Sequence, residues 1–215
     1  MAHWEQAIRK FTDPLVREMA ARGRTRSFPR GEHLIREGEA GDAVYVILSG
    51  RVKVYVSDTR GRELIVADYA AGEYVGEMAL DGRTRSASVA AVEPTVCSVV
   101  ARDALRTAIH DDPEIAMRMI ATLIERNRQA TGCLKNLALM DVYGRVARLL
   151  LDQETVVGAD GLAWSRERLT QQSIADRVGA SRDMISRILK DLRTGGYIAL
   201  RDKRVAILRR PPARW

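Results

Sequence analysis

The sequence predicts an α+β fold: a β-rich N-terminal part, then a long helix, then a helical C-terminal part that ends in two strands. Three observations support this fold class. Between Phe28 and Val100, apolar and polar residues alternate and eight glycines interrupt the pattern. From Pro113 the apolar period becomes helical, and beyond Asp141 short helical segments precede a basic strand pair.

The first elements expected are a short helical lead-in and a set of short strands. Apolar residues recur at helical spacing within Trp4–Ala21. Strict alternation then marks Val44–Leu48 and Val52–Val56, which flank the turn residues Ser49 and Gly50. Glycines at this density are poorly tolerated in helices, so a β-roll (double-stranded β-helix) or a small barrel fits best.

The long helix is expected to begin near Pro113, with Asp111 or Asp112 as its cap. Its apolar seam advances by three and four residues, through Ile120, Leu123, Asn127, Ala130, Leu134 and Leu137. A narrow seam of this kind favours pairing with a second copy of the chain. Packing of the helix back on the β-roll is the alternative.

The C-terminal part is expected to contain a helix from Val142 to about Gln153 and a loop with Gly158 and Gly161. Two helices and two strands, Tyr197–Leu200 and Val205–Leu208, follow. Two helices before a short basic hairpin form the outline of a winged helix.

The positive charge is concentrated in this C-terminal part. The chain has 215 residues and a formal net charge of +7; residues 142–215 carry 15 Lys and Arg against 8 Asp and Glu, whereas residues 1–141 carry 20 of each sign. A local basic excess suits a polyanion such as nucleic acid, because bound cations release condensed counterions. A solvated basic surface explains the charge equally well.

Residues 171–190 match the template of a helix-turn-helix. Gly179 suits the turn and Ser181 can cap the second helix. The residues expected to face the core are Ile174, Ala175, Val178, Ile185, Ile188 and Leu189. All of these positions fit the template at once, which predicts a DNA-reading element.

The exposed side of the second helix carries the candidates for base readout: Arg182, Asp183, Ser186 and Arg187. Arginine matches guanine O6 and N7, and a carboxylate can accept from cytosine N4. An ordinary charged helix face is the alternative. The candidates for phosphate contacts that position the domain are Thr170, Gln172, Ser181, Lys190, Arg193, Lys203 and Arg204.

Several functions are not expected. Cys97 and Cys133 are too few and too far apart for a disulfide framework, a structural zinc site or an iron–sulfur cluster. A metal-dependent enzyme built on the roll would need clustered His and carboxylate ligands, and the three histidines are isolated. The sequence therefore predicts no catalytic residues and no metal site. No long apolar run is present, so we expect a cytoplasmic protein without membrane association.

Three segments together resemble the CRP/FNR family of transcription regulators. Ser181–Leu189 (SRDMISRIL) is similar to the family's recognition helix, S-R-E-x-x-x-R-x-L. Asn136–Arg145 resembles the junction between the dimer helix and the DNA-binding domain. Gly76–Ser88 (GEMALDGRTRSAS) is similar to the phosphate-binding cassette. With Gly41-Asp42 and Gly50-Arg51-Val52 in the roll, the resemblance covers almost the whole chain.

The resemblance implies a cyclic-nucleotide-binding β-roll sensor domain (residues 1–112), a dimerisation helix (113–141) and a winged helix-turn-helix domain (142–215). It implies a homodimer that binds duplex DNA at a near-palindromic site and has RNA polymerase as a partner. The expected effector is cyclic AMP, with cyclic GMP, cyclic di-GMP or no ligand as alternatives. Neither haem nor an iron–sulfur cluster is expected.

The cassette also makes chemical sense on its own. Arg85 can meet the charge of a cyclic phosphate, Ser86 and the amides near Gly76 can donate to its oxygens, and Glu77 can accept from a ribose 2′-hydroxyl. A solvated Arg-Ser turn is the alternative. The nucleotide-binding residues implied are Gly76, Glu77, Met78, Ala79, Arg85, Ser86, Ala87 and Thr131.

The sequence departs from the family at two positions. Cyclic-AMP-binding members carry two adjacent hydroxyl residues on the dimer helix, whereas this chain has Ala130 and Thr131. Asp183 stands where the family has Glu, so the same operator is not expected. A regulator that binds DNA without a ligand, and a nucleotide sensor that acts through protein partners, are therefore alternatives.

Overall fold

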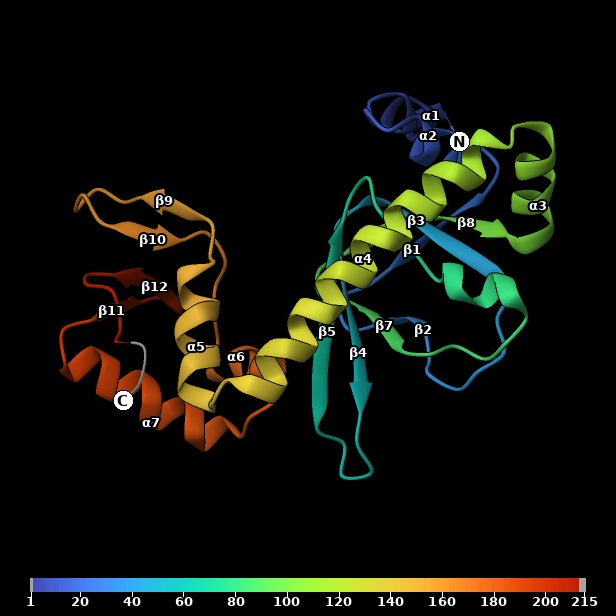
Figure 1. Ribbon diagram of the computed structural model, residues 1–215. Coiled ribbons are helices and arrows are strands. Elements are labelled where there is room, and N and C mark those ends of the chain that lie inside the picture. The colour runs from blue at the N-terminus through green and yellow to red at the C-terminus, as the bar shows by residue number, and fades with distance from the viewer. Residues whose placement is uncertain (1, 213–215) are drawn as a thin grey trace. The chain divides into compact units, whose positions relative to one another are not determined.

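The computed structural model of the chain describes residues 2–212, without the side chains of residues 2, 3, 6 and 79. Its contacts divide the chain into two compact units. Residues Met1–Ser57 and Ile65–Gln129 belong to the first unit, and Asp58–Leu64 and Ala130–Trp215 belong to the second. The α+β class expected from the sequence is confirmed (Figure 1).

The N-terminal lead-in consists of two helices, α1 (Ala2–Arg9) and α2 (Pro14–Ala21). The break lies at Asp13, whose carboxylate accepts a hydrogen bond from the Leu15 N–H at 2.8 Å. Proline in the first turn and an aspartate cap together start a new helix there. Leu15 and Met19 are buried, as their helical spacing suggests.

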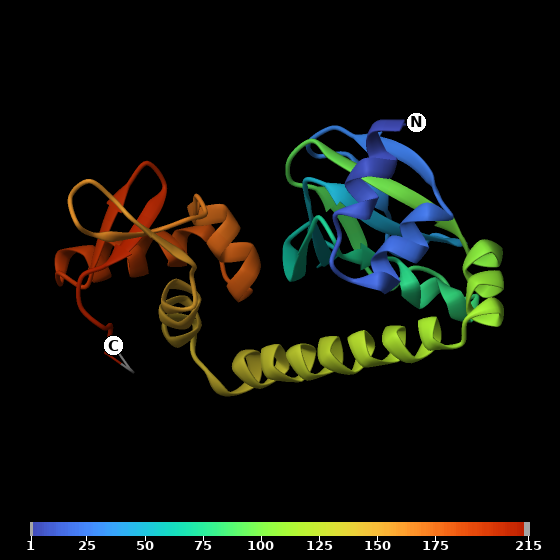
Figure 2. The same cartoon turned by 90° about the horizontal axis from the view of Figure 1, so that it is seen from above.

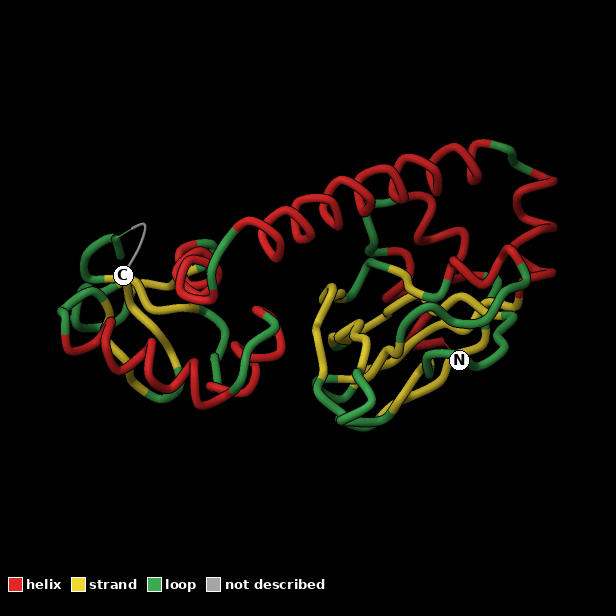
Figure 3. Tube along the Cα trace, turned by 60° about the horizontal axis from the view of Figure 1, so that its bottom comes forward, coloured by secondary structure: helices red, strands yellow, loops and turns green. Residues whose placement is uncertain are grey.

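The β-roll of the first unit contains two four-stranded sheets, with strand orders β1-β8-β3-β6 and β2-β7-β4-β5. The strands are β1 (Arg24–Phe28), β2 (His33–Ile35), β3 (Ala43–Ser49), β4 (Arg51–Ser57), β5 (Glu63–Ala70), β6 (Tyr74–Val75), β7 (Ser88–Ala91) and β8 (Thr95–Ala101). Figure 3 shows these strands gathered in yellow. Each registered pairing in this part is antiparallel.

The inner faces of these strands form the core of the roll. Phe28, Ile47, Val52 and Cys97 are fully buried within one apolar cluster. Burial raises the pKa of the Cys97 thiol to about 12, so this cysteine is a neutral apolar side chain. In β3, however, Ile47 and its neighbour Val46 are both fully buried, so this strand packs on both faces and the predicted alternation is only partly observed.

Two helices follow the roll, α3 (Arg102–Asp111) and the 26-residue α4 (Glu114–Leu139). The Asp112 carboxylate accepts from the Glu114 N–H at 3.1 Å, as expected of a cap. Ile115 and Met119 are buried in a core shared with α2, β3 and β8, so the first turns of α4 pack on the roll. Figure 2 shows α4 as one continuous helix.

Beyond these first turns the apolar seam of α4 is exposed in the single chain. Large apolar side chains of the predicted seam lie at the surface, including Ile120, Leu123, Leu137 and Leu134, the last of which is 66% exposed. Apolar packing of α4 on the roll is therefore limited to its first turns.

The second unit contains α5 (Val142–Leu151), β9 (Thr155–Val157), β10 (Ala163–Ser165), α6 (Gln171–Val178), α7 (Arg182–Thr194), β11 (Ile198–Arg201) and β12 (Arg204–Ile207). The last four strands form one antiparallel sheet in the order β11-β12-β10-β9. Where the sequence suggested only a loop, β9 and β10 form a hairpin around Gly158 and Gly161. Strands of three residues are too short to show a period.

Candidate functional site

The cassette begins at the end of β6. Gly76 follows with φ +89° and leads into a short 3₁₀ helix, η1 (Glu77–Asp81). A Cβ atom on Gly76 would lie 2.8 Å from Arg85 Nη1 and 2.9 Å from Ile35. Both the backbone angle and the space therefore require glycine here.

Arg85 is the centre of this cassette. Its guanidinium donates to the Gly76 carbonyl at 2.7 Å and to the Ala43 carbonyl at 2.8 Å, and the residue is only 7% exposed. Gly41 packs so closely against Arg85 Nε that a Cβ atom would have no room. Two backbone segments, residues 41–43 and Gly76, thus determine the position of one cation.

The charge of Arg85 has no anionic partner within the described chain. Both of its hydrogen bonds go to neutral carbonyl groups, and no carboxylate of residues 2–212 pairs with it. A guanidinium has five N–H donors, and the two bonds use only two of them. Because an uncompensated buried charge is costly, this arrangement fits a site whose anion comes from a ligand.

Glu77 and Arg126 form the second charged part of the cassette. Glu77 Oε1 lies 3.0 Å from Arg126 Nη1, and the two side chains are 9% and 16% exposed. Arg126, on α4, also donates to the Tyr74 carbonyl at 2.6 Å. Sequence reasoning missed Arg126, because no spacing links it to a glutamate 49 residues earlier in the chain.

Most of the other predicted cassette residues belong to the first unit, as Arg85 and Glu77 do. Ser86 is exposed and its hydroxyl contacts the Met78 sulfur at 3.2 Å; Met78 is 61% exposed. Ala87 is half-buried. The Ala79 side chain lies outside the described residues, and Thr131 lies on α4 in the second unit.

The helix-turn-helix of the second unit is locally determined as predicted. Thr170 and Ser173 form a reciprocal capping box at the start of α6. Gly179 ends α6 with φ +64° and ψ +51°, and the Ser181 hydroxyl accepts from the Met184 N–H at 3.3 Å to cap α7. The six residues expected to face the core are all buried.

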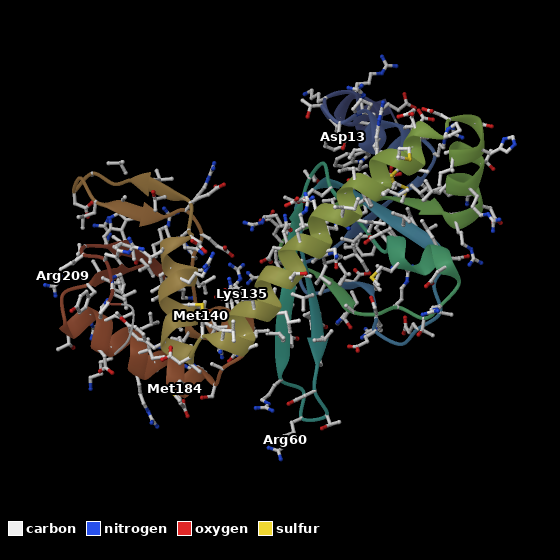
Figure 4. All side chains as sticks on the ribbon, viewed as in Figure 1. Asp13, Arg60, Lys135, Met140, Met184 and Arg209 are labelled. Atoms are coloured by element: carbon white, nitrogen blue, oxygen red, sulfur yellow. The ribbon has the colours of Figure 1, made fainter. Side chains whose placement is uncertain are left out.

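The outer face of α7 carries the base-reading candidates. Arg182, Asp183 and Arg187 are exposed, and Ser186 is half-buried with its hydroxyl 3.4 Å from the Gln171 amide nitrogen. Met184 is also exposed on this helix (Figure 4), where its sulfur and methyl can offer an apolar contact. Sequence reasoning left out Met184, although its position on the helix was available.

The candidates for phosphate contacts lie on three elements of this unit. Lys190 and Arg193 are exposed on α7, and the Gln172 amide on α6 donates to Asp176 at 2.7 Å. In the β11–β12 hairpin, Arg204 is half-buried and Lys203 exposed. Asp202 and Lys203 have φ +52° and +64°, so two non-glycine residues form the tip of this wing in left-handed conformations.

Half-buried arginine contacts hold α6 of this unit in place. Arg177 makes a two-pronged ion pair with Glu167, at 2.8 and 3.0 Å. Arg145, in the junction segment, donates to the carbonyls of Val178 and Met140 at 2.8 and 2.7 Å. These bonds link the start of α5 to the end of α6, directly before the turn that presents α7.

Two features that are absent from the described residues bear on other functions. No group of three or more His, Cys, Asp and Glu among residues 2–212 is arranged to hold a metal ion. None of the helices described combines the length and the apolar character that crossing a membrane requires.

Comparison with known proteins assigns both units. Residues 25–112 match the model of the cyclic nucleotide-binding domain, and residues 144–212 match that of the Crp-like helix-turn-helix domain. A CRP-like cAMP-activated global transcriptional regulator of Mycobacterium tuberculosis is 36% identical over 183 residues, which cover 84% of this chain and 82% of the relative. The cAMP-activated global transcriptional regulator CRP of Escherichia coli O157:H7 is 31% identical over 204 residues, 91% and 95% of the two chains.

Solved structures agree with this assignment. The c-di-GMP responsive global regulator CLP of Xanthomonas campestris superposes with a TM-score of 0.81 at 26% identity, covering 90% of this chain and 97% of that one. The relatives are transcription regulators and not enzymes. With a match to the cyclic nucleotide-binding domain in one unit and to the Crp-like helix-turn-helix domain in the other, the chain belongs to the CRP/FNR family of transcription regulators.

Proposed function

We propose that the chain is a homodimeric regulator that binds a near-palindromic site in duplex DNA when a cyclic nucleotide occupies its cassette. The observation that carries the ligand half of this proposal is Arg85, a buried cation with only carbonyl partners in the described chain. An anionic phosphate would supply the charge that the protein does not.

The roles of the cassette residues follow from their chemistry. Arg85 and the Ser86 hydroxyl would donate to the cyclic phosphate, together with amides near Gly76. Glu77 would accept from the ribose 2′-hydroxyl. Met78, Ala79 and Ala87 would line the same pocket.

Cyclic AMP is the first choice of effector. The relatives from M. tuberculosis and E. coli are described as cAMP-activated, whereas the regulator from X. campestris is described as c-di-GMP responsive. Thr131 would contact the base, and Ala130 beside it offers no hydroxyl. Cyclic GMP and cyclic di-GMP therefore remain alternatives.

The DNA half of the proposal rests on α7. Arg182 and Arg187 would donate to guanine, Asp183 would accept from cytosine, and Ser186 would add a further base contact. Phosphate contacts from the ends of both helices and from the wing would set the register: Thr170, Gln172, Ser181, Lys190, Arg193, Lys203 and Arg204. Two such helices in a dimer would occupy adjacent major-groove faces one turn apart.

The exposed seam of α4 supports the dimer. Large apolar side chains repeat along this helix at the surface of the single chain, in a pattern that a second copy can cover. We therefore divide the chain into a sensor domain (1–112), a dimerisation helix (113–141) and a DNA-binding domain (142–215). Nucleotide binding in the cassette would bias the conformation of the dimer helix and so set the separation of the two reading helices.

RNA polymerase is the proposed further partner. The segment from Thr155 to Ala163, which contains the β9–β10 hairpin, would present the contact surface, since β9 is exposed along its whole length. Because chromosomal DNA and RNA polymerase lie in the bacterial cytoplasm, the regulator would act there.

A fluorescence assay of duplex binding, with and without cyclic nucleotide, tests the proposal. A panel of cyclic AMP, cyclic GMP and cyclic di-GMP is first titrated by calorimetry. We expect cyclic AMP to bind and to increase the affinity for a near-palindromic duplex. Nucleotide binding without any change in DNA affinity would favour a sensor that acts through protein partners, and DNA binding with no nucleotide binding would favour a ligand-independent regulator.

A further inference from the structure

The Arg126 guanidinium lies between two aromatic rings. Its central carbon is 4.3 Å from the ring centre of Tyr69, on β5, and 4.8 Å from that of Tyr74, on β6. Cations are attracted to ring faces at these distances, most strongly where water is excluded. At 16% exposure, the Arg126 side chain is largely shielded from water.

The remaining contacts of Arg126 all fix its orientation. One terminal nitrogen donates to the Tyr74 carbonyl at 2.6 Å, and the other lies 3.0 Å from the Glu77 carboxylate. An arginine is among the side chains that lose most rotamer freedom when ordered, so a single ion pair would hold it weakly. The two rings and the carbonyl together direct one edge of the guanidinium at Glu77.

The two tyrosines differ in what else they do. Tyr74 is fully buried and belongs to the apolar core of the first unit. Tyr69 is half-buried and packs at the edge of the other core cluster, so the fold depends on it less. Its contact with Arg126 is therefore the feature that distinguishes Tyr69 from an ordinary surface residue of β5.

We propose that Tyr69 is a positioning residue for recognition of the ribose 2′-hydroxyl, acting through Arg126 to hold the Glu77 carboxylate in place. This inference rests on the proposed nucleotide site. Tyr69 contacts Arg126 and not the nucleotide itself. Without its ring, Arg126 and Glu77 would still form an ion pair, but the carboxylate would sample orientations that do not meet the hydroxyl.

The ring face of Tyr69, rather than its hydroxyl, makes this contact. Burial raises the pKa of Tyr69 above its ordinary value; the Arg126 charge opposes this rise and the Glu77 charge adds to it, so the phenol stays neutral. A neutral ring attracts Arg126 through its face alone. Phenylalanine should therefore replace Tyr69 without loss, whereas leucine should not.

Calorimetry with pairs of nucleotides tests the inference. The full chain, Tyr69→Phe and Tyr69→Leu are titrated with cyclic AMP, cyclic GMP and the 2′-deoxy form of each. Since a hydrogen bond to a charged group is worth about tenfold in affinity, we expect the unaltered chain to prefer the ribo form by about that factor. Tyr69→Phe should keep this preference to within about twofold.

For Tyr69→Leu we expect the preference to fall to about threefold or less, because only binding of the ribo form weakens. The 2′-deoxy form serves as the internal control, since its affinity depends on Arg85 and should change by less than about twofold. If Tyr69→Leu does not fold, Tyr69→Met is measured in the same way.

Each contrary outcome has its own meaning. If the leucine variant keeps the preference, or loses affinity equally for both forms, Tyr69 only packs and the inference is wrong. Loss of the preference in Tyr69→Phe would also overturn it, because the hydroxyl would then be the active part. If the unaltered chain binds none of the nucleotides, the proposed function itself fails, and the inference with it.

Discussion

The cassette and the recognition helix both present arginines, but they hold them in opposite ways. Arg85 is buried, with its guanidinium bonded to two backbone carbonyls. Arg182 and Arg187 are exposed on α7, and the helix beneath them is fixed by apolar residues and caps. The cassette therefore holds its charge inside the fold, whereas α7 carries its charge on the outer surface.

This difference matches the kind of partner proposed for each site. A small ligand can be surrounded, so the protein can bury a cation and leave the ligand to balance it. A DNA duplex is met on one face, so its reading side chains stay in water and the scaffold below supplies the rigidity. Substitutions should therefore separate the two sites by the partner whose binding they weaken, DNA for α7 and the nucleotide for the cassette.

The largest expected effect is on DNA binding. Replacing both Arg182 and Arg187 with alanine should weaken binding of the preferred duplex by about 100-fold or more, since each two-pronged guanine contact is worth about 1–3 kcal/mol. The melting temperature should hardly change, because both side chains are exposed. Fluorescence anisotropy and thermal unfolding measure the two quantities.

A matched control is Arg148→Ala, which removes an exposed arginine of α5 in the same unit. It should leave both the affinity and the sequence preference nearly unchanged. Survival of the sequence preference in the double variant would show that α7 is not the reading element.

The next largest effect is on the cassette. Arg85→Met should abolish the rise in melting temperature that cyclic AMP produces, a loss of at least about tenfold in affinity, because a charge-assisted contact is removed. Stability without ligand should change little: an unpaired buried charge is lost, but two carbonyls lose their donors. Arg83→Met, an exposed neighbour two residues away, is the control.

A ligand-induced rise that persists in Arg85→Met would contradict the assignment of Arg85 to the phosphate. A large fall in the stability of the ligand-free variant would instead mean that the carbonyl bonds outweigh the buried charge.

A smaller effect is expected at the wing. Lys203→Ala should weaken binding of all duplexes alike and reduce the slope of log K against log salt by about 0.9, the value for one phosphate contact. Titrations of a specific and an unrelated duplex at several salt concentrations measure this. A change confined to the specific duplex would make Lys203 a base-reading residue instead.

The smallest effect concerns the scaffold below α7. Gly179→Ala should lower the free energy of unfolding by about 1–2 kcal/mol, because the residue has φ +64°. Gly132→Ala is the control: it lies within α4 with open space around it, and alanine should stabilise a helix there by up to about 1 kcal/mol. Equal changes in the two variants, measured by urea unfolding, would remove the special role of the turn.

The sequence predicts local features of the fold well and distant ones poorly. Gly179 and Ser181 were identifiable because turn and cap chemistry depend on near neighbours. The break between α1 and α2 depends on an equally local signal, the Asp13 cap before Pro14. It was not predicted because the apolar residues on both sides keep a helical spacing. Arg126 could not be identified, since its ion pair with Glu77 forms only when α4 packs beside a segment far earlier in the chain.

Gly41 and Gly76 are required by the cassette in addition to Arg85. Neither position can accept a side chain while Arg85 keeps its place, because a Cβ atom at either one would collide with the guanidinium. A lineage that abandons its effector, and with it the fixed position of Arg85, is released from the restriction at Gly41, whereas the φ of +89° still restricts Gly76. Genome surveys that seek effector-free regulators should therefore look for a side chain at the Gly41 position, since such a substitution would displace Arg85 from the site.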